Sequence, residues 1–174
     1  MTKPNYHSPK DYLDAAKSSQ TPLDELARLA TSEYDFVRLA VARNPRTTSA
    51  ILRLLLPADL HGWNNQEIAS EIARNGKTPR ATLEKLAEKL IPHLDNGRGN
   101  EMAVEAAVRL CNNAGAPLRI IEMILSPDIP TGIRSRIATR TIRVDILREL
   151  TSDPSEAVCR KALNNLKKRE QGVR

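Results

Sequence analysis

The chain is poor in aromatic residues, with one Trp, one Phe and three Tyr among 174 residues. No segment alternates Val, Ile or Tyr with polar residues at a period of two, so the sequence does not predict β-strands. No run approaches the ~18 apolar residues that a membrane span needs. The sequence therefore excludes an integral membrane protein of the helical kind, and we expect a soluble, cytoplasmic protein.

Cysteine and histidine are scarce as well. Cys111 and Cys159 lie far apart, and they form no disulfide framework and no zinc-binding spacing. His7, His61 and His93 have no metal-ligand spacing to acidic residues or to the cysteines. No pairing of a nucleophile with a base can be argued from the order of the residues. We expect no metal, no cofactor, no catalytic residue and no small-molecule substrate.

Apolar residues recur at the spacing of short amphipathic helices. In DFVRLAVARNPRTTSAILRLL, residues 35–55, Val37 and Val41 mark one helix, and Leu52 and Leu55 mark a second. The Asn-Pro pair between them ends the first helix, because Pro cannot continue it. Helices this short are not stable alone in water. They must pack against neighbours of the same kind.

The two pairs of apolar residues repeat along the chain, which is the signature of stacked repeats. Pairs four apart mark the first helix of each unit, and pairs three apart mark the second. The first-helix pairs are Val37/Val41, Ile68/Ile72, Ala106/Leu110, Ile133/Ile137 and Val158/Ala162; the second-helix pairs are Leu26/Leu29, Leu52/Leu55, Leu83/Leu86, Ile121/Ile124 and Leu147/Leu150. We expect a single domain over residues 1–174, with repeats over 9–168, a basic tail at 167–174, and loops near 57–66 and 92–100.

The residues at the turns agree with this pattern. Thr21 and Thr78 precede prolines, and each predicts an N-cap followed by Pro at the first helical position. Thr47-Thr48 predicts a further N-cap. Segments beginning at Ser8 and Asp153 predict capping boxes for the first and last helices. An asparagine recurs at one position of the turn, which predicts a structural cap: Asn44, Asn75, Asn113 and Asn165.

The segments VRLAVARNPRTTSAILRLL and IASEIARNGKTPRATLEKLA resemble the variant leucine-rich repeat family, which belongs with the HEAT-like α-solenoids. The resemblance implies an all-α, right-handed α-solenoid, and the pattern predicts about eleven short helices in helix-pair repeats. One known member of the family carries an N-terminal iron–sulfur cluster on cysteines. The residues before Tyr12 contain no cysteine, so the resemblance does not imply a cluster in this chain.

Positive charge is concentrated at the C-terminal end, where residues 128–174 carry 11 basic and 6 acidic side chains. Arg136, Arg140 and Arg143 follow the i, i+4, i+7 spacing, which predicts that they share one helical face. Such a face would either bind a nucleic-acid backbone or simply be solvated. No aromatic residue lies between these arginines, so the sequence does not predict base stacking.

Three further features are candidates for contacting a partner. Arg43 and Arg74 occupy matched turn positions, where they would bind phosphate or carboxylate groups, or contact helix-end carbonyls in a solvated turn. Trp63, in the first predicted loop, would anchor a partner or cover the adjacent helix pair. The segment Gly97–Asn100 would cradle a phosphate before a helix or form a plain flexible loop.

These features predict a non-enzymatic repeat scaffold that mediates protein–protein interaction, because stacked repeats offer extended surfaces. The alternative is nucleic-acid binding through the basic C-terminal third. A HEAT-like DNA-repair enzyme is a third hypothesis, although the chain has few aromatic residues to hold an extruded base. Fold alone does not decide between these hypotheses.

Overall fold

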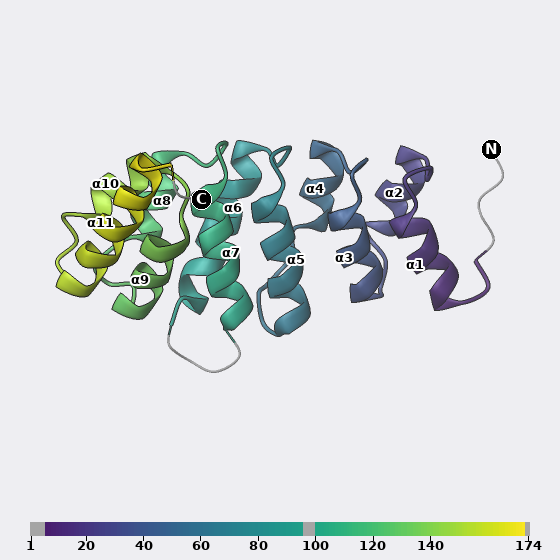
Figure 1. Cartoon of the computed structure of the whole chain (residues 1–174). Helices are drawn as coiled ribbons and strands as arrows, with labels where there is room; N and C mark the ends of the chain where they lie inside the picture. Colours follow the sequence, from purple (N-terminus) through teal and green to yellow (C-terminus); the bar gives the residue numbers. More distant parts are fainter. Residues whose placement is uncertain (1–5, 96–99, 173–174) are drawn as a thin grey trace.

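The computed structural model describes residues 6–95 and 100–172. Within these ranges the protein is all-helical, with eleven α-helices, one short 3₁₀ helix and no strand. Figure 1 shows the helices arranged along one direction, from α1 at one end of the molecule to α11 at the other. None of the helices described is long and apolar enough to cross a membrane.

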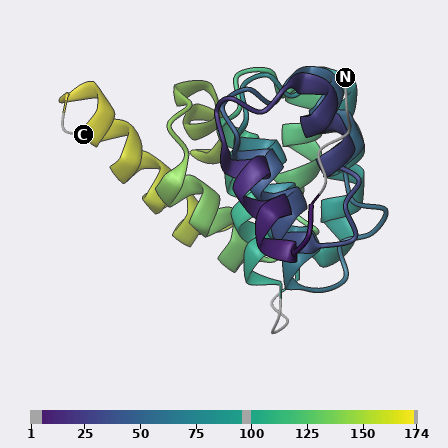
Figure 2. The same ribbon diagram turned by 90° about the vertical axis from the view of Figure 1, so that its right-hand side faces the viewer.

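The odd-numbered helices form one row, in which each packs against the next. They lie in front in Figure 1. Their bounds are α1 Pro9–Lys17, α3 Asp35–Arg43, α5 Trp63–Arg74, α7 Glu101–Asn112, α9 Thr131–Arg140 and α11 Glu156–Glu170. Figure 2 shows that α11 extends forward beyond the rest of this row.

The even-numbered helices form a second row behind the first. Each contacts the odd-numbered helix that precedes it, and within the row α2 packs on α4 and α6 packs on α8. Their bounds are α2 Leu23–Leu29, α4 Ser49–Leu55, α6 Arg80–Leu90, α8 Leu118–Ile124 and α10 Val144–Leu150, and the 3₁₀ helix η1 Ile91–His93 follows α6. The core lies between the two rows.

The apolar pairs predicted from the sequence fill this core. Each residue of the ten pairs is at most 4% exposed. Burying one large apolar side chain stabilises the folded chain by about 1.5–3 kcal/mol. Helices of seven to fifteen residues therefore depend on their neighbours, because this burial happens only between helices.

Two of the threonines at the turns do not form the N-caps that the sequence predicts. Thr21 and Thr78 donate from their hydroxyls to the backbone carbonyls of Ala15 and Ile72, both at 2.6 Å. The prolines that follow hold the N-cap positions and make no side-chain cap. The predicted N-caps at these threonines are wrong, because each hydroxyl closes back onto the end of the preceding helix. Thr48 does cap α4, since its Oγ1 accepts from the Ile51 N–H at 3.4 Å.

One of the two predicted capping boxes forms. Ser8 and Asp11 make the reciprocal bonds of a capping box at the start of α1, as predicted. At α11 the N-cap is Ser155, which makes no side-chain cap, so the second predicted box is wrong. The reason is that Asp153 is engaged elsewhere, in an ion pair with Arg134 of α9.

The loops predicted near 57–66 and 92–100 separate α4 from α5 and η1 from α7. Trp63 lies at the end of the first loop, as the first residue of α5 rather than in the loop itself. Gly62, with a positive φ of 84°, turns the chain into that helix, a conformation that favours glycine. Residues 97–99 of the predicted phosphate-binding segment lie outside the described residues.

Candidate interaction surface

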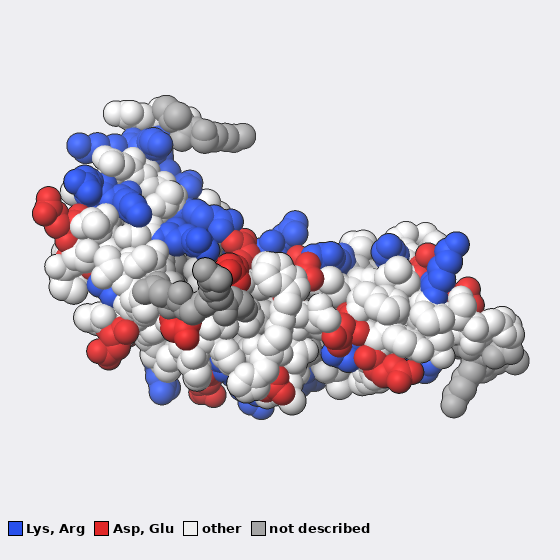
Figure 3. All heavy atoms as spheres, turned by 90° about the horizontal axis from the view of Figure 1, so that it is seen from below, with Lys and Arg blue, Asp and Glu red and all other residues white. Residues whose placement is uncertain are grey.

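The candidate site is the surface that the odd-numbered helices present on the side away from the even-numbered row. Figure 3 shows that the molecule is curved and hollowed along this side, and that Lys and Arg side chains gather there. They are densest at the end formed by α9 to α11. We call this surface the concave face.

Recurring asparagines hold the odd-numbered helices in register. Asn44 donates from Nδ2 to the backbone carbonyls of Ala16 and Ser18, at 2.8 and 2.9 Å, at the end of α1. Asn113 bonds the end of α5 in the same way, and Asn165 bonds the end of α9. The predicted structural cap is confirmed for these three positions, with the difference that each caps the neighbouring helix. They satisfy carbonyls that a helix end leaves unpaired.

Glu71 is the centre of a set of ion pairs on the concave face. Its side chain is 8% exposed, and its Oε1 lies 3.0 Å from Arg109 Nη1 and 3.3 Å from Arg43 Nε. Arg74 Nη1 lies 3.6 Å from the other oxygen, Oε2. One carboxylate of α5 therefore binds arginines from α3, α5 and α7.

The ion pairs continue to both sides of Glu71. Arg43 Nη2 lies 2.8 Å from Glu67 Oε1. Arg109 Nε lies 3.1 Å from Glu105 Oε1, and Arg140 of α9 also binds Glu105. Hydrogen bonds from Arg140, followed by those from Arg109, hold the pKa of Glu105 below its usual value despite partial burial. We call the whole set the ion-pair ladder: Arg43, Glu67, Glu71, Arg74, Glu105, Arg109 and Arg140.

The ion-pair ladder contains three of the arginines predicted from the sequence, and it shows which groups they bind. Arg43 and Arg74 occupy matched positions, as the last residues of α3 and α5 rather than in the turns that follow, and both bind carboxylates of this chain rather than helix-end carbonyls. Arg140 is likewise paired within the chain. The positive charge of these three arginines is thus largely compensated before any partner arrives.

Arg143 does not share a helical face with the other two arginines of its predicted group. α9 ends at Arg140, Thr141 has extended backbone angles, and Arg143 is the N-cap residue of α10. The predicted i, i+4, i+7 face is therefore wrong at this position, because the helix stops three residues too early. Arg143 Nε binds Asp145 Oδ1 at 3.1 Å, and that interaction lowers the pKa of Asp145.

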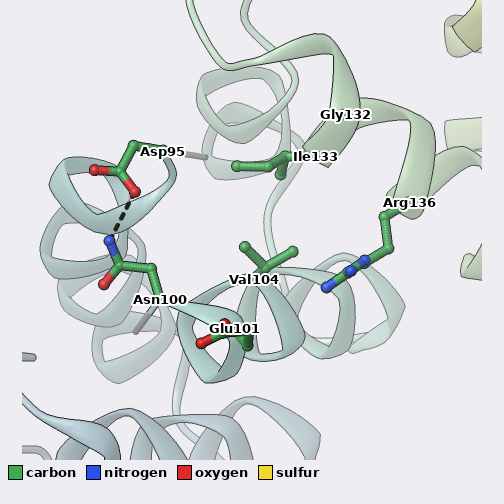
Figure 4. Close-up of a pocket in the computed structure, with 7 residues that line it drawn as sticks. All are labelled: Asp95, Asn100, Glu101, Val104, Gly132, Ile133 and Arg136. Atoms are coloured by element: carbon green, nitrogen blue, oxygen red, sulfur yellow. Dashed lines mark hydrogen bonds between the residues drawn. The ribbon is translucent and has the colours of Figure 1, made fainter. Parts of the chain in front are cut away.

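Arg136 is the one predicted arginine without an ion pair or hydrogen bond in the part of the chain that the structure describes. It extends from α9 over Val104 of α7, at the edge of a hollow of about 260 Å³ (Figure 4). Asp95 and Glu101 also line this hollow. A cation and two carboxylates in its lining leave the hollow with mixed charge.

Trp63 lies at the N-terminal end of α5, and it is 52% exposed. It lines a shallow hollow with His61 and His93, whose ring centroids are 5.2 Å apart. With half of its surface in solvent, Trp63 is accessible to a partner. No wider aromatic surface surrounds it, because the other aromatic residues gather elsewhere.

The structure brings four of the five aromatic residues together at the N-terminal end. Tyr6, Tyr12, Tyr34 and Phe36 form a chain of rings with centroids 4.5, 5.9 and 5.4 Å apart. Burial, followed by the hydrogen bond to Glu25, raises the pKa of Tyr6 to about 12. No local pattern in the sequence indicates this cluster, because it depends on the packing of α1 against α3.

Among residues 6–95 and 100–172, both cysteines are free. No group of three or more His, Cys, Asp or Glu side chains there could hold a metal ion. Cys111 is buried, and burial raises the pKa of its thiol to about 12. It is therefore a thiol at neutral pH, not a nucleophilic thiolate.

Comparison with known proteins identifies no relative of this chain. No protein-family model, curated protein or solved structure matches the chain. The class of protein is therefore argued from the geometry of the helices and of the concave face.

Proposed function

We propose that the chain is a right-handed α-solenoid of helix-pair repeats, similar to variant leucine-rich repeat and HEAT-like proteins, and that it forms one domain. The two rows of helices, the ten buried pairs and the asparagine bonds between successive odd-numbered helices support this class. Within this class, the function that we propose is that of a scaffold whose concave face binds a protein partner.

The observation that carries the proposed function is the mixed charge of the concave face. From α3 to α9 the ion-pair ladder alternates arginines with glutamates. The glutamates offset most of the arginine charge, so the ladder offers a polyanion little net attraction, whereas a protein surface carries both signs of charge and can complement them. A long, exposed face of this kind fits a protein better than a nucleic-acid backbone.

Nucleic-acid binding is the second candidate function, and the charge of residues 128–174 favours it. Of its three predicted arginines, Arg140 and Arg143 already bind carboxylates, and Arg136 alone is uncompensated. Phosphate contacts would therefore have to come mainly from α11, at the end of the molecule. We rank this candidate below the scaffold for that reason.

The test is a capture experiment on the full chain, made with and without nuclease. We expect protein partners that nuclease treatment does not release. Arg74→Glu should weaken their capture, because Arg74 is on the concave face, where its side chain is 68% exposed. Arg80→Glu is the matched control, since Arg80 is 71% exposed, also pairs within its own helix, and lies on α6 in the other row.

Two results would contradict the proposed function. Partners that disappear after nuclease treatment would favour nucleic acid instead. Equal loss of capture with both charge reversals would show that the concave face is not the surface that binds. Thermal melts of both variants check that the fold is retained.

A further inference from the structure

Positive charge on the concave face is compensated along the ion-pair ladder but not beyond it. Arg136 of α9 and Lys161 and Lys168 of α11 are exposed, and none makes an ion pair with another described residue. Helix α11 carries five basic and two acidic residues, the basic ones being Arg160, Lys161, Lys167, Lys168 and Arg169. Figure 3 shows that Lys and Arg side chains are densest at this end of the concave side.

Two of these three cations, Arg136 and Lys161, have matched positions on neighbouring helices, and the third lies further along α11. Lys161 lies three residues after the buried Val158, as Arg136 lies three residues after the buried Ile133. Because α11 packs directly on α9, Arg136 and Lys161 occupy the same position on adjacent helices of one row. Lys168 follows Lys161 by seven residues, about two helical turns, and so lies on the same side of α11.

We propose that Arg136, Lys161 and Lys168 form a basic docking surface for an acidic peptide segment of the partner protein. This inference rests on the proposed scaffold function and names the chemistry of what the scaffold binds. Carboxylates form charge-assisted hydrogen bonds with guanidinium and ammonium groups, which are stronger than neutral ones.

The length of this surface favours a short peptide. Packed helices lie about 8–10 Å apart, and an extended chain covers about 10 Å in three residues. Acidic residues three apart would therefore reach from α9 to α11. A nucleic acid that followed the concave face further would meet the carboxylates of Glu67, Glu71 and Glu105. No aromatic side chain is among the three cations or beside them on α9 and α11 to stack on a base.

The test measures fluorescence anisotropy of a labelled ten-residue peptide with Glu at every third position and Ser and Gly between. A Gln version of the peptide, a 20-nucleotide oligo-dT and a 20-base-pair duplex serve as comparison probes. The docking variant is R136Q/K161Q/K168Q. The matched control is R53Q/R119Q/R148Q, which removes three exposed, unpaired arginines from the even-numbered helices α4, α8 and α10.

We expect the wild-type chain and the control variant to bind the Glu peptide equally at physiological salt, and the docking variant to bind it about tenfold more weakly or worse. The Gln peptide should not bind. Equal weakening by both variants would overturn the inference, because it would reflect net charge alone. Tighter binding of the oligonucleotide or duplex, lost in the docking variant, would also overturn it and assign the surface to nucleic acid.

The capture experiment separates this inference from the proposed function. If the docking variant captures the nuclease-resistant partner as well as the wild-type chain does, the proposed scaffold function is supported and the proposed docking surface is contradicted. If the wild-type chain captures no protein, the proposed scaffold function is contradicted. The docking surface is then judged by the peptide measurements. All substituted side chains are exposed, and melts of each variant confirm that the fold is retained.

Discussion

Arg134 and Asp153 form the most buried ion pair among the described residues. Their side chains are 4% and 3% exposed, and Arg134 Nε lies 2.8 Å from Asp153 Oδ2. Arg134 also donates hydrogen bonds to the backbone carbonyls of Pro127 and Ile129, so its guanidinium has acceptors besides the Asp153 carboxylate. The pair ties α9 to the turn before α11, which is the helix that carries most of the uncompensated positive charge.

The pair predicts a pH-dependent stability. Burial alone would raise the pKa of Asp153, but hydrogen bonds from Arg134 and from the Ser155 N–H lower it overall. A carboxyl group with a lowered folded-state pKa stabilises the fold above its unfolded-state pKa of about 3.9, and this contribution is lost as the pH falls through the folded-state value. The stabilisation is therefore complete at neutral pH and is lost in acid.

Asp153→Asn should lower the free energy of unfolding by about 3–5 kcal/mol at pH 7, because it leaves the Arg134 charge buried and unpaired. Urea unfolding at pH 7 and pH 3 measures the difference between variant and wild type. The difference should shrink at pH 3, because below the unfolded-state pKa of about 3.9 the Asp153 carboxyl of the unfolded wild-type chain becomes neutral. A difference that stays constant with pH would mean that the charge of Asp153 contributes nothing.

At the scale of helices, the asparagine bonds join elements that are distant in sequence. Asn113 donates to the carbonyls of Ala73 and Asn75 at 2.7 and 3.1 Å, about forty residues back along the chain. Its Oδ1 also accepts from the Gly115 N–H at 2.9 Å. One side chain therefore fixes its own turn and the end of the neighbouring helix.

Asn113→Ala should cost about 1–3 kcal/mol of unfolding free energy, because it leaves buried backbone groups without partners. Asn164→Ala is the matched control, since Asn164 is an exposed asparagine of α11 whose side chain makes no hydrogen bond to another described residue. Its effect should stay within about 0.5 kcal/mol. Urea melts of the two variants compare them directly, and equal losses would refute the structural role of Asn113.

Helix positions and buried faces could be predicted from the sequence, because the apolar pairs report burial directly. The hydrogen bonds at the turns could be predicted only in part. A Thr before Pro fits an N-cap, yet the hydroxyls of Thr21 and Thr78 find a carbonyl of the preceding helix, whose direction is set by tertiary packing. For the same reason the box expected at Asp153 is replaced by an ion pair with a residue nineteen positions away.

The candidate site was less predictable than the fold. The sequence predicts Arg43 and Arg74 at matched turns and Arg136 on a basic helical face, but which of them are neutralised depends on the carboxylates that the fold places beside them. Glu71 lies 28 residues from Arg43 and 38 from Arg109. No local pattern reveals such pairs, so the sequence showed the charges and the structure alone showed their compensation.

At the scale of the whole molecule, the two rows make an elongated, curved shape (Figures 1 and 3). A compact domain of this length has a radius of gyration of about 16 Å. The radius of gyration in solution should exceed that value, because the helices extend along one direction instead of around a centre. Small-angle X-ray scattering measures it, and a value at or below about 16 Å would contradict the arrangement of the rows.

The charge of the concave face depends strongly on the single residue Glu71, and this has an evolutionary consequence. A glutamate codon becomes a lysine codon by a single base change. At position 71 that change would remove the counter-charge shared by Arg43, Arg74 and Arg109 and add a fourth cation beside them. The middle of the face would become predominantly basic and continuous with the basic end at α9 and α11. Selection could thus convert a surface of mixed charge into a polyanion-binding one by one mutation, while every buried apolar pair stays as it is.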